Sequence, residues 1–331
     1  MPLPLNLLKW MGSNGPAVLF FGVLVGLVFP SLADFAHPYM ATGVWLFTFG
    51  VFAKTNLAEF RSSARRPAGT ACALVAAVIV APLIAALCAS AMGFPLDLAA
   101  GIALATAAPP SGAAMVAMLG LEVSLAVFVM IVAVMLSPVT LPWLVGALGV
   151  DVPIDSWALA ERLAWLTIPP ALAAFALKRT APGFVHRNTM AATGMASLGL
   201  LIVALGAMRG IQTMVLASPW QAAGYLALAF ALNLGLQALG SIITKAAFKM
   251  NTRDALTMGL CFGNRNISLV SAAAAPFLSS HPDSALFMAM SFLPIFILPQ
   301  LQTLWMNESD KRRQDQNLPL SSGRVLPTTE N

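Results

Sequence analysis

Long apolar stretches separated by short polar loops dominate the chain. Several run for about twenty residues without a charged side chain, which is the length that a helix needs to cross ~30 Å of hydrocarbon. Hydropathy and helix-breaking residues predict ten such segments, and we expect each to be a transmembrane helix. Their predicted bounds are residues 16–33, 38–53, 68–92, 97–119, 122–148, 158–178, 190–208, 218–241, 254–278 and 284–305.

Two of these segments are interrupted. The fourth contains AAPPSGAA, in which Pro109 and Pro110 lack backbone N–H groups and Gly112 adds backbone freedom. The ninth contains CFGNRNIS, with Gly263 at the corresponding position. Because each half has five segments, the halves must have opposite orientations, and such an inverted repeat is typical of secondary transporters. Taken singly, each break also fits an ordinary kink of a membrane helix.

These patterns predict an all-α membrane protein made of two inverted five-helix repeats. The repeats are residues 16–148 and 158–305, and the broken segments are the fourth and the ninth. Residues 1–15 form an N-terminal cytoplasmic segment in this interpretation. Residues 306–331 are polar and are expected to be a disordered cytoplasmic tail.

Composition and charge support a membrane location and set its orientation. The chain is 59% hydrophobic and only 9% charged, against ~25% charged residues in a soluble domain. Most of its 18 Lys and Arg fall in loops on one side, while Arg162 and Arg209 fall on the other. By the positive-inside rule, both termini are cytoplasmic, and we expect the inner (plasma) membrane of a bacterium. The basic residues of the cytoplasmic side are Lys9, Lys54, Arg61, Arg65, Arg66, Lys178, Arg179, Arg187, Lys245, Lys249, Arg253, Lys311, Arg312, Arg313 and Arg324. Since they lie in loops, their charge indicates topology, and no nucleic-acid partner is expected.

Arg265 is an ionisable residue inside a predicted span. An arginine near the middle of a membrane helix costs at least ~2.5 kcal/mol, so it should face a cavity or a partner. Its side chain is therefore a candidate for binding a solute, and the alternative is that it only ties down unwound backbone carbonyls. The candidate solute-binding residues are Ser111, Asn233, Gln237, Asn264, Arg265, Asn266 and Ser268, with Ser271 as a further polar neighbour.

Other polar residues point less clearly to a function. Asn233 and Gln237 are four residues apart on one helical face, which fits contact between helices as well as a solute path. Asp97 and Glu122 lie at predicted span ends, where solvation explains them. The histidines lie in loops, and the cysteines lack metal-ligand spacing, so no metal or other cofactor is predicted.

The ten segments and two motifs resemble the bile acid:sodium symporter superfamily over residues 16–305. The motifs are PPSGAAMVAMLGLEVSLAV (residues 109–127) and GNRNISLVSAAAAPFL (residues 263–278). The resemblance implies that the fourth and ninth segments cross where they unwind, with sodium ions beside the crossing. It also implies a panel domain of segments 1, 2, 6 and 7, a core domain of the other six, and small organic anions as solutes.

The sequence departs from that family at the positions expected to bind sodium. Pro109, Gly263 and Asn266 match the family pattern. Where the family carries oxygen-bearing side chains, this chain has Ala114, Met115, Ala126, Met130, Cys261 and Arg265. Sodium prefers several oxygen ligands, one of them anionic, and none of these side chains contains an oxygen. We therefore expect Arg265 to stand in for the cation, and its planar fork also suits an anionic solute.

The leading hypothesis is an alternating-access carrier of a small organic anion that depends little on sodium. One alternative retains sodium coupling through backbone and hydroxyl oxygens. Another is a membrane sensor that binds without transporting. An enzyme is not expected, because the spans hold no GxSxG motif, histidine cluster or carboxylate pair. The sequence names neither the solute nor the oligomeric state.

Overall fold

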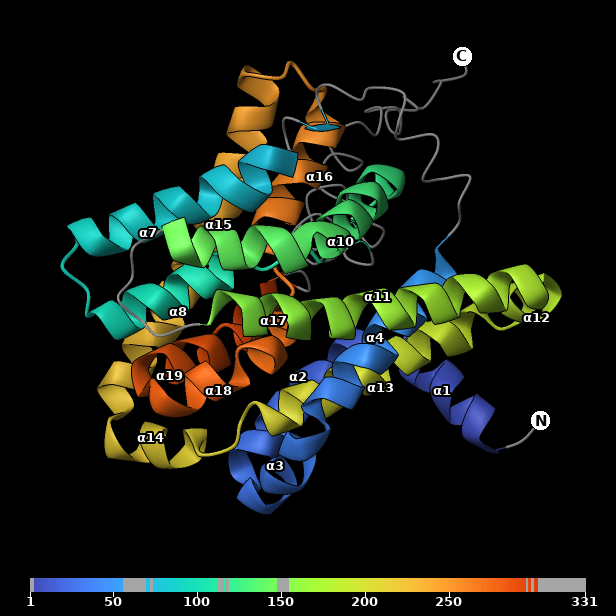
Figure 1. Ribbon diagram of the computed structural model, residues 1–331, viewed down its shortest axis with the longest axis horizontal. Helices are drawn as coiled ribbons and strands as arrows, with labels where there is room; N and C mark the ends of the chain where they lie inside the picture. The colour runs from blue at the N-terminus through green and yellow to red at the C-terminus, as the bar shows by residue number, and fades with distance from the viewer. Residues whose placement is uncertain are drawn as a thin grey trace, which may run out of the picture.

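The protein is helical throughout the part that the structure describes (Figure 1). The computed structural model describes residues 3–55, 70–71, 74–111, 113, 116, 119–147, 155–295, 297–298 and 301–302. Within these residues no β-strand occurs, and one isolated antiparallel bridge joins Pro110 to Arg265. The predicted all-α class is therefore confirmed. The predicted tail, residues 306–331, lies outside the described residues.

Prolines and polar caps set the helix starts of the first half. Pro30 begins a new helix after Phe29, whose backbone leaves the helical region. Asp97 lies in the first turn of the helix that follows Pro95, where its negative charge suits the helix dipole. The elements are α1 (Leu3–Ser13), α2 (Gly15–Val28), α3 (Pro30–Ala36), η1 (His37–Tyr39), α4 (Met40–Lys54), the π-helical η2 (Ala76–Val80), α7 (Ala81–Ala91), α8 (Leu96–Ala107) and α10 (Val123–Ala147).

Similar signals organise the second half. Asp155 accepts hydrogen bonds from the backbone N–H groups of Trp157 and Ala158 and so caps the helix that begins at Ser156. Asn251 caps a later helix through the N–H of Asp254 at 2.8 Å. The elements are α11 (Ser156–Thr180), α12 (Pro182–Arg187), α13 (Thr189–Gly206), α14 (Ile211–Ala217), α15 (Pro219–Ala246), α16 (Thr252–Gly263), α17 (Ile267–Ala273), α18 (Ala275–Ser280) and α19 (Pro282–Met290).

Three of these helices are long and apolar enough to cross a membrane by themselves: Val123–Leu144 in α10, α13 and α15. A fourth span is formed if α1 and α2, which are bent by 95°, are taken together. The segments η2 with α7 (Ala76–Ala91) and α8 are apolar but shorter. The ninth predicted segment divides into the short helices α16, α17 and α18, and in the described part of the fourth α8 ends at Ala107, so helix length alone does not count these segments.

The outer surface carries large apolar side chains. Trp157, Trp165 and Trp220 are 79%, 69% and 89% exposed, and Leu216 and Phe35 are similarly open. In water such a surface would associate, whereas in a bilayer hydrocarbon covers it. Together with the apolar helices, it fits a protein inserted in a membrane.

The helices pack in two groups (Figure 1). In one, α13 packs against α4, α1 and α2, and α4 also packs against α11. In the other, α15 packs against α16 and α19, and α8 packs against α7 and α19. The long helix α10 contacts both α11 and α16, while α17 touches α4, α11 and α13. The polar break of the ninth predicted segment therefore lies where the two groups meet.

Small residues permit the closest helix contacts in the first group. A Cβ added at Gly194 would lie 1.7 Å from the carbonyl oxygen of Leu8, so α1 and α13 touch through their backbones. A Cβ at Gly199 would lie 2.2 Å from the carbonyl oxygen of Gly43 on α4. Such contacts are typical of helices packed inside membranes. They also show that the N-terminal segment, predicted only as cytoplasmic, is largely a helix held against α13.

Candidate functional site

Two interrupted helices cross at the centre of the site. Helix α8 ends at Ala107, α16 ends at Gly263, and the chain beyond each is extended. The N–H of Ser111 donates to the carbonyl of Asn264, and the N–H of Asn266 donates to the carbonyl of Pro109, both at 2.8 Å. These reciprocal bonds form the antiparallel bridge and pair backbone groups that the helix ends leave free.

Local sequence explains why both helices stop there. A proline disfavours the helical conformation of the residue before it, and Ala108, which precedes Pro109, has φ −54° and ψ 139°. In the ninth predicted segment, Asn264 is extended, with φ −81° and ψ 101°. The chain re-enters a helix at Asn266, whose Oδ1 accepts from the N–H of Leu269 and so caps α17.

The guanidinium of Arg265 lies at the crossing and donates three hydrogen bonds, all to backbone carbonyls. Its Nε donates to the carbonyl of Phe262 at 2.6 Å, and its two terminal nitrogens donate to the carbonyls of Ala108 and Ala77 at 3.3 and 2.8 Å. Arg265 is only 3% exposed. One side chain thus joins three segments that lie far apart in the sequence.

Ala77 is available as a partner because of a π-helical turn. In η2 the N–H of Ala81 bonds to the carbonyl of Ala76, five residues earlier. By the same register, the carbonyl of Ala77 would need an N–H at position 82, but Pro82 has none. The orphaned Ala77 oxygen instead accepts from Arg265.

The charge of Arg265 matches its surroundings. Helices α8 and α16 both point their carboxyl ends at the crossing, and each helix end carries roughly half a negative charge. Two such ends amount to about one negative charge, which a single guanidinium offsets. Helix α17 begins at the crossing and its N-terminus adds some positive charge as well, so no added cation is needed to offset the two carboxyl ends.

A chain of hydrogen-bonded side-chain amides ends at the last residue of α16, where the ninth predicted segment breaks. Gln302 donates from Nε2 to Gln237 Oε1, Gln237 donates from Nε2 to Asn233 Oδ1, and Asn233 donates from Nδ2 to the carbonyl of Gly263. The first two bonds are 2.7 Å long and the last is 3.1 Å. Gly263 permits this approach, since a Cβ there would lie 2.3 Å from Gln237 Cγ.

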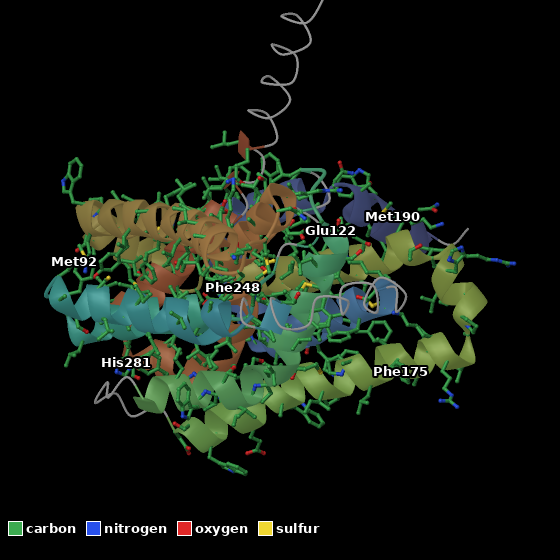
Figure 2. The ribbon with its side chains drawn as sticks, turned by 90° about the horizontal axis from the view of Figure 1, so that it is seen from above. Met92, Glu122, Phe175, Met190, Phe248 and His281 are labelled. Atoms are coloured by element: carbon green, nitrogen blue, oxygen red, sulfur yellow. The ribbon has the colours of Figure 1, made fainter. Side chains whose placement is uncertain are left out.

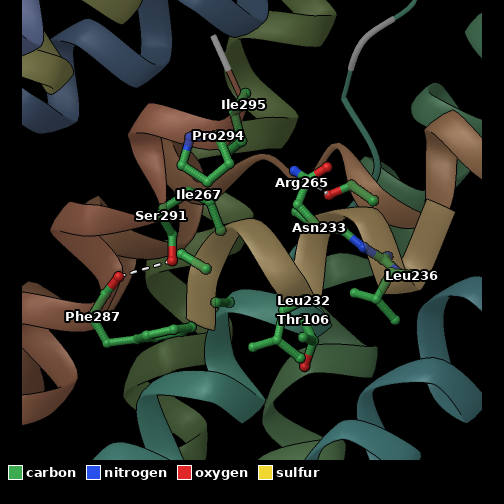
Figure 3. Close-up of a pocket in the computed structure, with 13 residues that line it drawn as sticks. Thr106, Leu232, Asn233, Leu236, Arg265, Ile267, Phe287, Ser291, Pro294 and Ile295 are labelled. Atoms are coloured by element: carbon green, nitrogen blue, oxygen red, sulfur yellow. Dashed lines mark hydrogen bonds between the residues drawn. The ribbon is translucent and has the colours of Figure 1, made fainter. Parts of the chain in front are cut away.

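Two small cavities flank the crossing. One, of about 30 Å³, lies between α8, α15 and the last helices, and Arg265, Asn233 and Thr106 contribute polar atoms to its wall (Figure 3). The other, of about 10 Å³, lies between α4 and α10 and reaches Asn266. A cavity needs roughly 10–15 Å³ of such volume to hold one water, so the first has room for a water and the second is at that limit. Neither is large enough for an organic solute.

Asp97 has a structural role that its position at a span end did not indicate. Its carboxylate accepts from the backbone N–H groups of Asp283 and Ser284 at 3.0 and 3.2 Å, and so caps α19 from another helix. Glu122 (Figure 2) lies 3.8 Å from Arg253, and its N–H donates to Thr257 Oγ1. The explanation by solvation alone was therefore wrong for Asp97 and incomplete for Glu122.

The structure brings most of the predicted site residues together. Pro109, Pro110 and Ser111 meet Asn264, Arg265 and Asn266 at the crossing, and Asn233 and Gln237 reach it through Gly263. Ser268 and Ser271 are buried on α17. Gly112, Ala114 and Met115 lie outside the described residues. Sequence reasoning missed Ala77, Pro82 and Gln302; the signal for Ala77 was Pro82 within an apolar segment.

The structure is that of an all-helical protein whose apolar helices fit insertion in a membrane, with an arginine buried where two broken helices cross. No protein-family model matches the chain, and no curated protein matches it either.

Proposed function

We propose that this protein is a secondary transporter that moves a small organic anion by alternating access. Its architecture would be that of the bile acid:sodium symporter superfamily, with ten spans in two inverted repeats. The observation that carries the proposal is the antiparallel crossing of α8 and α16 ends at buried Arg265. Broken helices that meet inside a membrane protein typically mark a transport site.

The relative direction of the two extended segments at the crossing supports the inverted repeat. Two repeats of opposite orientation bring equivalent segments together in antiparallel fashion, as the bridge between Pro110 and Arg265 does. The distribution of Lys and Arg supports the same even number of spans.

Low sodium dependence follows from the fixed charge. Arg265 already neutralises the helix ends and occupies the carbonyls of Phe262, Ala108 and Ala77, the kind of oxygen that would bind a mobile cation. We expect replacement of sodium by choline to change transport by less than about threefold, or roughly 0.65 kcal/mol of coupling.

Opening of the site would require the two helix groups to separate. Helix α17 begins at the crossing and packs against α4, α11 and α13, so these contacts form the barrier beside Asn266. A guanidinium carries five N–H donors, and Arg265 makes three bonds with them. The remaining donors would face a solute once that barrier opens.

The test has two stages. Purified protein is screened by thermal shift against small carboxylates, sulfonates and neutral analogues, with sodium or choline, because a ligand of the native state raises its stability. The best ligand is then followed as flux into proteoliposomes. Anions should bind and move with either cation. Binding without flux would instead show a sensor, and a steep, saturable sodium requirement would show sodium coupling.

Variants of Arg265 separate its two proposed roles. Arg265→Gln should abolish flux, and Arg265→Lys should retain weak flux, because lysine keeps the charge but lacks the planar fork. Asn233→Ala removes the bond to the Gly263 carbonyl, and if Asn233 only joins helices the variant should mainly lose stability, by about 0.6 kcal/mol. Normal anion flux by well-folded Arg265→Gln would eliminate the arginine from the mechanism.

A further inference from the structure

A third cavity lies away from the crossing, where α4, α10 and α11 meet. Its volume is about 280 Å³, far larger than the two cavities beside Arg265. Apolar side chains form nearly all of its wall, and the polar residues lie among the last residues of α4 and α11. The lining residues are Phe52, Thr55, Ile131, Met135, Ile168, Ala171, Leu172, Phe175 and Lys178.

One side of this cavity is formed by residues that are open to the surroundings. Ile168, Leu172 and Phe175 on α11 are 44%, 63% and 52% exposed, although all three line it (Phe175 is labelled in Figure 2). Residues 158–178 of α11 form the sixth span that the sequence predicts, and exposed side chains of such a span meet hydrocarbon. In that placement the cavity is a groove that opens sideways into the bilayer.

The length of the groove corresponds to one leaflet. From Ile168 to Lys178 helix α11 rises by about 15 Å, at ~1.5 Å per residue. That distance is about half of the ~30 Å hydrocarbon thickness. An acyl chain in the groove would thus place its headgroup near Lys178.

The charge at the headgroup end is positive. Lys178 donates from Nζ to the carbonyl of Thr55, which fixes the ammonium beside the end of α4. Lys54 and Arg179 are its neighbours in the last turns of α4 and α11, and those turns contain no acidic residue. An ammonium with further donors favours a lipid headgroup of net negative charge over a zwitterionic one, in which a cationic group offsets the phosphate.

We propose that this groove binds one anionic phospholipid, with an acyl chain along Leu172 and Phe175 and its phosphate at Lys178. The proposal does not depend on the transport function, because it concerns a lipid held at the side of the helix bundle. A bound lipid here would cover the joint between α4 and α10, which also flanks the crossing.

Native mass spectrometry of the delipidated full chain tests the proposal, with phosphatidylglycerol and phosphatidylcholine of identical acyl chains as probes. The wild type should retain one phosphatidylglycerol at least fivefold more tightly than phosphatidylcholine. Lys178→Gln should lose this preference and Lys178→Arg should keep it. Ala171→Phe, which fills the groove, should weaken binding of both lipids. Lys245→Gln, a basic residue in the last turn of α15, is the matched control and should behave like wild type.

Thermal unfolding of each variant separates lost binding from lost folding, and the Lys178→Arg variant keeps the test valid if Ala171→Phe does not fold. Equal binding of the two lipids by wild type would overturn the proposal, as would an undiminished preference in folded Lys178→Gln. Binding of dodecanoate without phosphatidylglycerol would assign the groove to a soluble anion and overturn it as well.

Discussion

Removal of the fixed charge at the crossing should make the stability of the protein depend on sodium. In Arg265→Gln the carbonyls of Phe262, Ala108 and Ala77 lose a charged donor while the two helix ends remain. The side-chain amide of glutamine reaches about as far as the Nε of arginine, so one donor group remains, and glutamine carries no charge. The variant therefore presents carbonyl oxygens in a negative potential, which is the environment that a small hard cation prefers.

The expected magnitudes follow from the contacts. Three hydrogen bonds to a charged donor contribute roughly 6 kcal/mol at ~2 kcal/mol each. Relief of the cost of burying an arginine in the membrane offsets about 3 kcal/mol of that loss. With one bond of about 1 kcal/mol kept by the glutamine, the net destabilisation is about 2 kcal/mol. At ~2 °C per kcal/mol, the melting temperature should fall by about 4 °C in choline chloride.

Sodium should restore much of this loss in the variant and little in the wild type. A sodium ion bound with a Kd of ~10 mM would contribute about 1.6 kcal/mol at ~150 mM, or about 3 °C. Cys261→Glu in the same background adds an anionic oxygen and should increase the effect. The assay is thermal unfolding in sodium chloride against choline chloride at equal ionic strength. Identical melting curves of both variants in the two salts would refute the account of Arg265 as a built-in cation.

Further predictions concern packing and topology. Asp97→Ala should lower the free energy of unfolding by about 1 kcal/mol through loss of the α19 cap, and Asp97→Asn by less; chemical or thermal unfolding measures both. Gly194→Val should release α1 from α13 and expose the N-terminus to protease, whereas Gly224→Val, where a Cβ meets nothing within 4 Å, should not. Equal cleavage of the two variants would contradict the backbone contact. Cysteines at Arg187 and His281 should label from the cytoplasm and from outside respectively, and labelling of Arg187 from outside would overturn the ten-span topology.

The sequence located the breaks because prolines and glycines act locally. Pro109 and Pro110 remove donors wherever they occur in a helix, so the end of α8 could be placed within a few residues. The polar run around Arg265 was equally visible, since a charge among apolar residues demands a partner. Local chemistry thus sufficed for the existence of the site.

The partners of Arg265 could not be predicted in the same way. Ala77 bonds to it because of a π register in a helix almost two hundred residues earlier in the chain, and the sequence does not encode where that carbonyl points. Asp97 was misinterpreted for a related reason, because the N-terminus that it caps belongs to α19. The predicted span bounds were also longer than several helices, since hydropathy averages across a bend such as that at Phe29.

The reciprocal bonds between the segments around Pro110 and Arg265 involve main-chain atoms alone. Any residue type can supply a carbonyl or, proline excepted, an N–H, so this pairing does not itself depend on which side chains the bonded positions carry. The two segments should therefore stay joined in a variant whose charge at the crossing differs, which is what the Arg265→Gln experiment requires.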